Sequence, residues 1–134
     1  MSADKTITAH IIETGESDFA VSIDVSGHRI TGDEPEDAGG KNLGPAPYEL
    51  LTAALGECTA MTVRWCALQQ KWPLDKVEVN LTFQKINKVG IFEKQVIVHG
   101  DQLTDEQRKK LIEIAAKCPV QRTLESKIEI RTLS

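Results

Sequence analysis

Several patterns that define common classes of protein are missing from this sequence. Its three cysteines are an odd number and lack the dense spacing of a small secreted protein held together by disulfides. The N-terminus has no basic start followed by an apolar core, and the most apolar stretch is interrupted by Gly56, Glu57 and Arg64. Both observations argue against secretion and against a membrane span. We therefore expect a cytoplasmic protein.

An excess of positive charge is missing as well. With 16 basic and 20 acidic residues the net charge is −4, which argues against a nucleic-acid-binding protein. The cysteines and the three histidines show no paired short spacings of the kind that zinc sites use, so we expect neither a metal nor another cofactor. No internal repeat or low-complexity tract is evident, and the length suits one domain over residues 1–134.

Alternating apolar and polar residues predict a hairpin at the start of the chain. The two strands cover residues 5–13 and 18–30, and the sequence TGES forms the turn between them. Residues 31–47 are rich in glycine, proline and acidic side chains, so we expect a loop or the rim of a site there.

Helical spacing of apolar residues begins at Pro47 and extends to about Lys71, with the proline suitably placed in the first turn. Gly56 costs about 1 kcal/mol relative to alanine in a helix interior. It permits close packing of another backbone or marks a kink, and we favour a kink just before Cys58. The apolar stripe of this helix comprises Leu51, Ala54, Leu55, Cys58, Met61, Thr62, Trp65 and Leu68.

The second half of the chain repeats the change from strand to helix. Residues 76–86 and 91–100 alternate as a second hairpin. A helix follows over residues 103–118, with Thr104 as its N-cap and Gln107 at the capping-box position.

The order of these elements predicts the α+β class, with antiparallel sheets and a long central helix that covers one sheet face. Residues 126–133 alternate once more and predict a closing strand. The central helix is apolar around much of its circumference, because Val63, Cys66 and Ala67 lie off its main stripe. One small sheet would leave apolar surface uncovered, so we expect a partner chain, with a two-fold dimer favoured by base rate.

Two cysteines occur in settings that suit a reactive thiol. Cys118 directly precedes Pro119 at the start of a helical turn, where unpaired N–H groups and the helix dipole favour a thiolate. If the fold brings Cys58 to Cys118, the two form a dithiol that can react and then reset itself. Cys66 lies eight positions after Cys58, about 12 Å along a helix, whereas a disulfide needs Cα atoms within about 7 Å. We therefore interpret Cys66 as a small buried apolar residue.

Residues 44–79, GPAPYELLTAALGECTAMTVRWCALQQKWPLDKVEV, and residues 117–130, KCPVQRTLESKIEI, resemble the OsmC/Ohr family of hydroperoxide-reducing and related redox proteins. The resemblance covers most of the chain. It implies an intertwined homodimer in which each sheet packs against central helices. The active sites would then lie at the subunit interface.

The resemblance also implies an antioxidant activity in the stress response. Cys58 would be the peroxidatic residue, attacking the O–O bond of an organic hydroperoxide and becoming a sulfenic acid. Cys118 would be the resolving residue, condensing with it to a disulfide that an external thiol reopens. Lipoyl-type dithiols serve some members of the family, so a dithiol reductant is expected here.

Further site residues follow from the resemblance. The family activates its thiolate with a Glu–Arg pair, and Glu49 is the candidate for the Glu, while Arg29 and Lys41 are the candidate cations, of which Arg29 is preferred. From the residues alone, Glu49 is a first-turn helix acid and Arg29 is an outward strand residue. The apolar part of the peroxide would lie against side chains that are otherwise core residues, namely Leu51, Leu55, Met61 and Trp65.

An alternative hypothesis belongs to a different functional class. The chain would be a non-catalytic member of the same fold that binds a small molecule or has a structural role, with buried and inert cysteines. Loss of thiols on treatment with an organic hydroperoxide separates the two hypotheses.

Overall fold

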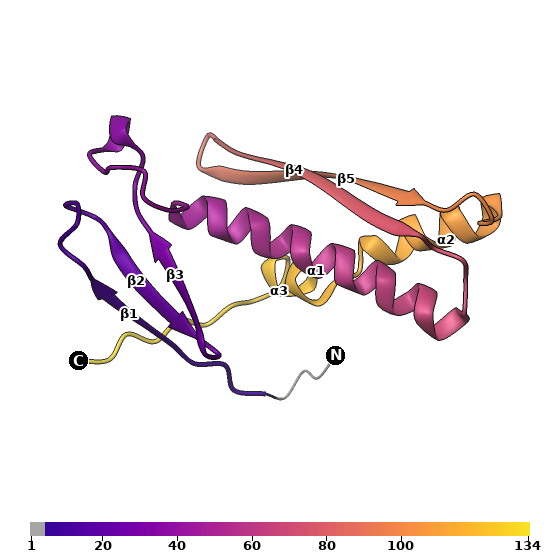
Figure 1. Cartoon of the computed structure of the whole chain (residues 1–134), viewed down its shortest axis with the longest axis horizontal. Coiled ribbons are helices and arrows are strands. Elements are labelled where there is room, and N and C mark those ends of the chain that lie inside the picture. Colours follow the sequence, from indigo (N-terminus) through magenta and orange to yellow (C-terminus); the bar gives the residue numbers. More distant parts are fainter. Residues whose placement is uncertain (1–4) are drawn as a thin grey trace. The chain divides into compact units, whose positions relative to one another are not determined.

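The computed structural model describes residues 5–134, which form two compact units divided between Leu50 and Leu51. Figure 1 shows the elements in chain order. The first unit contains β1 (Ala9–Glu13), β2 (Val21–Val25), β3 (His28–Gly32) and the 3-10 helix η1 (Glu36–Ala38). The helix α1 (Pro47–Gln70) begins there and continues into the second unit, which also contains β4 (Lys76–Ile86), β5 (Val89–His99), α2 (Asp105–Ala115) and α3 (Pro119–Leu124). Antiparallel strands and a long helix confirm the predicted α+β class.

The first unit has a three-stranded antiparallel sheet in the order β1-β2-β3, where the sequence predicted a two-stranded hairpin. The predicted strand over residues 18–30 is divided by a two-residue turn at Ser26 and Gly27, whose φ angles are 51° and 80°. Val25 pairs with His28 across this turn. Positive φ at both central positions gives the twist that a tight hairpin needs. The apolar alternation of Val21, Ile23 and Val25 ends at this turn, and the Ser26-Gly27 pair is the turn signal that the prediction of one continuous strand missed.

A buried carboxylate organises the loop that follows β3. Asp33 is 4% exposed. Its Oδ1 accepts hydrogen bonds from the Ser17 hydroxyl at 2.7 Å and from the Glu34 backbone N–H at 2.8 Å. Its Oδ2 accepts from the backbone N–H groups of Lys41 at 3.0 Å and Leu43 at 3.3 Å. One side chain therefore satisfies three backbone donors of a segment that has little regular structure.

The long helix α1 forms as predicted, but the face that it buries differs from the predicted stripe. Val63 and Ala67, which lie off that stripe, are 0% and 1% exposed and belong to the core of the second unit. Periodicity could not identify this side because the helix is apolar in most directions. Three residues of the predicted stripe are between 50% and 65% exposed, namely Met61, Trp65 and Leu68.

Gly56 allows α1 to approach the β4–β5 hairpin closely. A Cβ atom added to Gly56 would lie 2.6 Å from Cδ1 of Leu81 on β4. The helix continues through this position without interruption. Interpreting Gly56 as a kink was wrong, and close packing accounts for the glycine.

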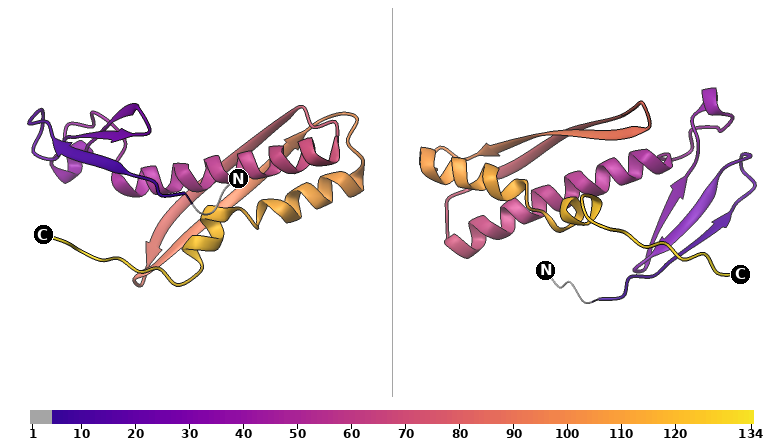
Figure 2. Two further views of the ribbon diagram at one scale, coloured as in Figure 1. Left: turned by 90° about the horizontal axis from the view of Figure 1, so that it is seen from below. Right: turned by 180° about the vertical axis from the view of Figure 1, so that it is seen from behind.

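The second unit is built on the β4–β5 hairpin, which agrees with the prediction to within two residues. Ile86 pairs with Val89 across a turn in which Asn87 and Lys88 have φ angles of 52° and 69°. The helices α1 and α2 lie on the same face of this hairpin (Figure 2). The core between these elements consists of Val63, Ala67, Leu74, Val98, Leu103, Leu111 and Ala115.

The predicted helix caps of the second unit are confirmed. Thr104 caps α2, and its side chain and that of Gln107 form the reciprocal capping box. Cys118 is the N-cap of the short helix α3, with Pro119 in the first helical position. Among the described helices, none is both long and apolar enough to cross a lipid bilayer.

The closing strand predicted for residues 126–133 is wrong for the isolated chain. No strand is assigned after α3. Ile128, Ile130 and Leu133 in this segment are 51%, 87% and 90% exposed. An alternating segment forms a strand only where another strand edge accepts its hydrogen bonds.

Candidate functional site

The second unit brings Cys58 and Cys118 together. Cys58 lies in the middle of α1, and Cys118 caps α3. The two thiols lie close enough to influence each other's pKa, and the backbone N–H of Val120, two residues after Cys118, donates to Sγ of Cys58 at 3.5 Å. Two thiols 60 positions apart in the sequence are thus neighbours, and all three cysteines are free of disulfides.

The three cysteines differ in exposure and surroundings. Cys118 is fully buried at 0% exposure, whereas Cys58 is partly exposed. Cys66 is also partly exposed and packs against the hydrophobic core. Of the paired thiols, Cys58 is therefore the one that a reagent from solvent meets first.

Thr59 and Lys94 form a polar arrangement on the inner side of Cys118. The Thr59 hydroxyl is 3.5 Å from Sγ of Cys118 and 2.8 Å from the Leu55 carbonyl oxygen. Lys94 on β5 donates from Nζ to Thr59 Oγ1 at 2.8 Å and to the carbonyl oxygen of Ala115 at 2.7 Å. A half-buried ammonium group therefore lies two hydrogen bonds away from the buried thiol.

These contacts shift the pKa values of the two thiols in opposite directions. Burial is the largest influence on Cys118 and acts to raise its pKa, but hydrogen bonds from Thr59 and the Gln121 N–H and the charge of Lys94 together lower it. Burial raises the pKa of Cys58, and the neighbouring Cys118 acts in the same direction. In the isolated chain Cys118 is thus the more acidic thiol of the pair.

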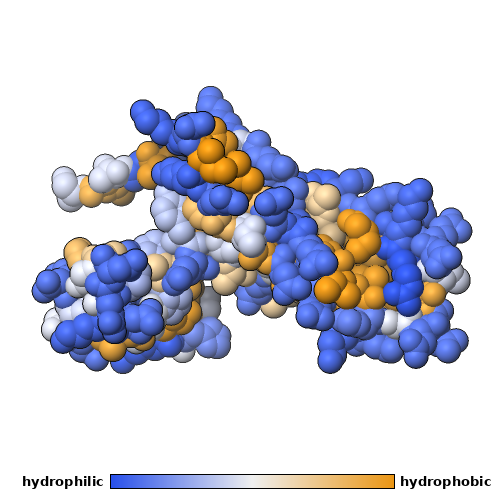
Figure 3. Space-filling model, turned by 90° about the horizontal axis from the view of Figure 1, so that it is seen from above, coloured by the Kyte–Doolittle hydropathy of each residue, from blue (hydrophilic) through white to orange (hydrophobic). Residues whose placement is uncertain are grey.

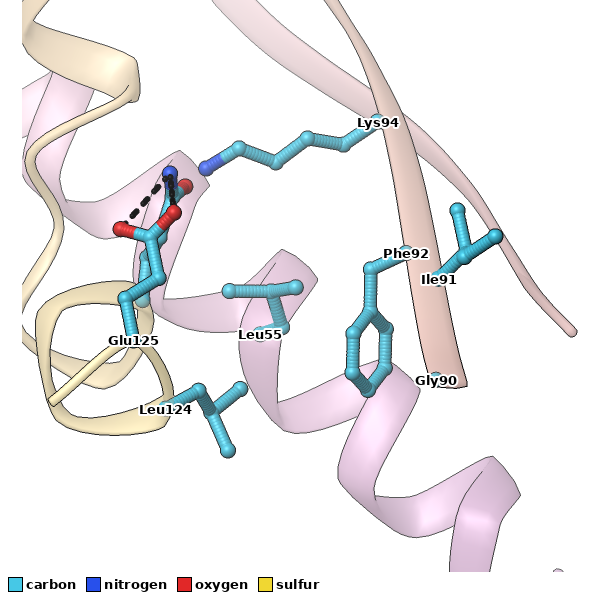
Figure 4. Close-up of a pocket in the computed structure, with 8 residues that line it drawn as sticks. Leu55, Gly90, Ile91, Phe92, Lys94, Leu124 and Glu125 are labelled. Atoms are coloured by element: carbon cyan, nitrogen blue, oxygen red, sulfur yellow. Dashed lines mark hydrogen bonds between the residues drawn. The ribbon is translucent and has the colours of Figure 1, made fainter. Parts of the chain in front are cut away.

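A groove with a volume of about 420 Å³ lies next to this arrangement (Figure 4). Leu55 contributes its wall from α1, and Lys94 extends across from β5. Glu125 accepts hydrogen bonds from the Gln121 side-chain amide at 3.5 Å. The lining residues are Leu55, Gly90, Ile91, Phe92, Lys94, Gln121, Leu124 and Glu125.

The structure separates the residues expected to form a substrate pocket. Leu55 is 3% exposed and lines the groove. Leu51 is half-buried and does not belong to its lining. Met61 and Trp65 are about half exposed on α1, where they belong to the uncovered apolar face. Their place in a substrate pocket remains a prediction.

Glu49 and Arg29 each have a local partner in the first unit. Glu49 Oε1 accepts a hydrogen bond from the backbone N–H of Ala46 at 2.8 Å, as a first-turn acid does. Arg29 lies on β3 with its side chain 76% exposed and pairs with Asp24 at 3.1 Å. Both contacts agree with the roles that the residues alone suggest for these side chains.

Sequence reasoning missed Thr59 and Lys94, although the signal for Lys94 was present. Phe92, Lys94, Val96 and Val98 alternate along β5, and the lysine is the single charged residue among these four inward positions. A lone charge within an apolar alternation requires a buried partner. Thr59 is adjacent to Cys58 in sequence, but only the packing of α3 on α1 reveals that it contacts Cys118.

Among residues 5–134, no group of three or more histidine, cysteine, aspartate or glutamate side chains is arranged to hold a metal ion. The site described above consists of two adjacent thiols with a nearby hydroxyl and ammonium group.

The fold and the site together define an α+β protein with a paired dithiol. The family model described as OsmC-like protein matches residues 39–132, which is more than half of the chain. The chain belongs to this family. No curated protein matches it in a sequence comparison.

Solved structures share the fold. An OsmC-like protein from Mycoplasma pneumoniae is 19% identical with a TM-score of 0.76, over 91% of this chain and 89% of the other. An organic hydroperoxide resistance protein from Legionella pneumophila is 19% identical with a TM-score of 0.63, over 92% and 91% of the two chains. The organic hydroperoxide resistance protein OhrB of Bacillus subtilis is 19% identical with a TM-score of 0.61, over 90% and 91%. At this level of identity the likeness shows the fold alone.

Proposed function

We propose that this protein reduces organic hydroperoxides through Cys58 and Cys118. The observation that carries the proposal is the proximity of a partly exposed thiol on α1 to a buried thiol at the cap of α3. The proteins from Legionella pneumophila and Bacillus subtilis that share this fold are named organic hydroperoxide resistance proteins, which supports the choice of oxidant.

In the proposed reaction, Cys58 Sγ attacks the terminal oxygen of the hydroperoxide and the O–O bond breaks. The products are a Cys58 sulfenic acid and an alcohol, which takes up the proton that the thiol lost. Cys118 Sγ, as a thiolate, then attacks the Cys58 sulfur. The S–O bond breaks, the S–S bond forms, and the departing hydroxide becomes water by taking a proton from solvent. Two thiols have then given two electrons to the peroxide.

An external dithiol closes the proposed cycle by exchange with the disulfide. Partial exposure makes Cys58 the sulfur that the reductant attacks, because Cys118 is fully buried. A dithiol is favoured over a monothiol, since its second sulfur displaces the mixed disulfide intramolecularly.

The raised pKa of Cys58 in the isolated chain requires a group that favours its thiolate. By the family resemblance, we propose that Arg29 and Glu49 fulfil this role in the assembled protein. Arg29→Met is then expected to lower peroxide turnover while leaving the fold intact, whereas Arg29→Lys retains part of the activity. Equal activity in all three proteins would remove Arg29 from the proposal.

We also propose that the protein acts as a homodimer. Met61, Trp65 and Leu68 recur at helical spacing on α1 and are at least half exposed. Figure 3 shows apolar patches on the molecule seen from above. Exposed apolar side chains that recur on one helix face are typical of an interface. A second chain would cover this face.

The proposal is tested by following hydroperoxide consumption with cumene hydroperoxide and with hydrogen peroxide, using a dithiol or a monothiol reductant. Cys58→Ser is expected to abolish consumption. Cys118→Ser is expected to leave Cys58 open to over-oxidation to the sulfinic acid, which mass spectrometry detects. Cys66→Ser is the matched control and should retain activity.

The same experiment decides the alternative of a non-catalytic, small-molecule-binding or structural protein. Burial of Cys118 and the raised pKa of Cys58 favour that alternative. If wild-type protein keeps its free thiols in the presence of excess cumene hydroperoxide, the peroxidase proposal is wrong.

A further inference from the structure

Lys94 holds an unusual position for a lysine. It lies on the inward face of β5, and its Nζ donates hydrogen bonds to a threonine on α1 and to the last carbonyl of α2. The partners are Thr59 Oγ1 at 2.8 Å and the Ala115 oxygen at 2.7 Å. A lysine normally extends into water, and ordering its flexible side chain costs free energy. These contacts therefore fix the charge at one place in the second unit.

The Thr59 hydroxyl transmits this charge to Cys118. Thr59 and Cys118 are both 0% exposed, and their Oγ1 and Sγ atoms are 3.5 Å apart. The hydroxyl carries one proton, which it gives either to the Leu55 carbonyl oxygen at 2.8 Å or to the sulfur. Lys94 already donates to Oγ1, so this oxygen is a weakened acceptor for an S–H group and a strengthened donor to a thiolate. Both effects favour the ionised form of Cys118.

We propose that Lys94 is a positioning residue that acts through Thr59 to keep Cys118 as a thiolate, ready to resolve the Cys58 sulfenic acid. The proposal rests on the proposed peroxidase function and adds that Lys94 is the cation that supports its second step, the attack of Cys118 on the Cys58 sulfenic acid. The resolving step needs a thiolate, because the thiol is not the nucleophile. A buried sulfur without a nearby donor or cation would be protonated at neutral pH.

The difference in exposure and acidity gives the two sulfurs different roles in the proposed reaction. Cys58 is the thiol that solvent-borne peroxide reaches, and Cys118 is sealed from it. An acidic thiolate at the surface would itself be open to oxidation. The buried Cys118 avoids this, and the sulfur that it attacks is the neighbouring Sγ of Cys58.

The first test measures Cys118 ionisation without peroxide. The full chain carrying Cys58→Ser and Cys66→Ser contains Cys118 as its only thiol, and ultraviolet thiolate absorbance follows its titration without a reagent entering the core. Adding Lys94→Met is expected to raise the pKa of Cys118 by about one unit or more. Thr59→Val should act in the same direction, whereas Lys94→Arg and Thr59→Ser should largely restore the parent titration.

A matched control removes a lysine from the same hairpin. Lys76 is an exposed residue of β4 that pairs with His99, and His99 lies five positions after Lys94 on β5. Lys76→Met should therefore leave the titration of Cys118 unchanged. Should Lys94→Met fail to fold, Lys94→Gln provides the same test. An unchanged Cys118 titration in folded Lys94 and Thr59 variants would overturn the proposal.

The second test follows oxidation in proteins that keep both thiols. With Lys94→Met, trapping with dimedone is expected to show a longer-lived Cys58 sulfenic acid at neutral pH, and disulfide formation slows by about tenfold per unit of pKa increase. Raising the pH should restore the rate, which a merely structural defect would not allow. A rate equal to that of wild type, or a slow rate without recovery at alkaline pH, would contradict a role through ionisation.

The two tests distinguish failure of this inference from failure of the proposed function. If no variant reacts with hydroperoxide, the peroxidase proposal fails, while the titration still shows whether Lys94 controls Cys118. If peroxide oxidises Cys58 normally but the titration does not respond to Lys94, the inference alone fails.

Discussion

The two paired thiols show how surroundings assign different chemistry to the same side chain. Cys118 is sealed and accepts hydrogen bonds from Thr59 and from the Gln121 N–H, so its pKa is lowered despite burial. Cys58 is more open, but burial and the adjacent sulfur raise its pKa. When the two thiols together carry one negative charge, that charge therefore lies mainly on Cys118. Activation of Cys58 is therefore the role that we propose for Arg29 and Glu49 in the assembled protein.

The contribution of the buried Asp33 carboxylate to stability is expected to depend on pH. Burial acts to raise its pKa, but hydrogen bonds from Ser17 and from three backbone N–H groups bring it below the ordinary value of 3.8. A lowered folded-state pKa contributes stability above the unfolded-state pKa, and this contribution is lost as the pH falls through the folded-state value. Asp33→Asn is therefore expected to reduce the urea midpoint of the first unit at neutral pH.

The difference in urea midpoint between Asp33→Asn and wild type should narrow as the pH falls from 3.8 through the lowered folded-state pKa, where the carboxylate of the folded wild-type protein becomes protonated. Chemical unfolding at neutral and acidic pH measures this change. Asp24→Asn is the matched control, because Asp24 is an exposed partner of Arg29. A gap between the Asp33→Asn and wild-type midpoints that is independent of pH would contradict the role of ionised Asp33.

The helix α2 begins with a capping box that the sequence predicts and the structure contains. The Thr104 hydroxyl accepts the Gln107 backbone N–H at 3.1 Å, and the Gln107 side chain accepts the Thr104 N–H at 3.0 Å. Thr104→Ala removes half of this box and is expected to lower the free energy of unfolding by about 1 kcal/mol. Urea denaturation followed by circular dichroism measures the loss.

Thr104→Ser keeps the capping oxygen and should retain most of the stability, which makes it the matched control for Thr104→Ala. Because α2 also supplies the Ala115 carbonyl that Lys94 contacts, a loosened helix would affect that lysine. Equal stability of the alanine and serine variants would show that the capping box contributes little.

Self-association is the prediction for the whole molecule. Trp65 lies on α1 with half of its surface exposed, between Met61 and Leu68 on the same face. Replacing it by glutamate would place a charge in the proposed interface. Trp65→Glu is expected to weaken dimerisation by about 2 kcal/mol or more, since buried tryptophans are frequent hot spots. Light scattering after size-exclusion chromatography measures the mass at several concentrations.

Gln70→Glu adds the same charge to an exposed position of α1 that lies on the side away from Met61 and Trp65, and it should leave the dimer intact. The Trp65→Glu protein should also lose peroxide turnover if assembly completes the site around Cys58. Wild-type protein that elutes as a monomer at all concentrations would contradict the proposed homodimer.

Predictions from the sequence succeeded where the deciding forces are local. Pro47 at the start of α1, the Thr104 box and Cys118 before Pro119 each depend on neighbours within a few residues. The β4–β5 hairpin follows from alternation and from a turn at two adjacent positions, Asn87 and Lys88. The closing strand failed because its hydrogen-bonding partner is not local.

The amino-acid sequence by itself determined the α+β class, the long helix, the caps and the two cysteines as candidates for reaction. Only the tertiary structure decided that Val63 faces the core while Trp65 faces outward, and that Lys94 reaches Thr59 beside the buried sulfur. The physical reason is that propensity and periodicity act along the chain. The choice among several apolar helix faces, and the pairing of polar groups from different elements, arise only when the elements pack against one another.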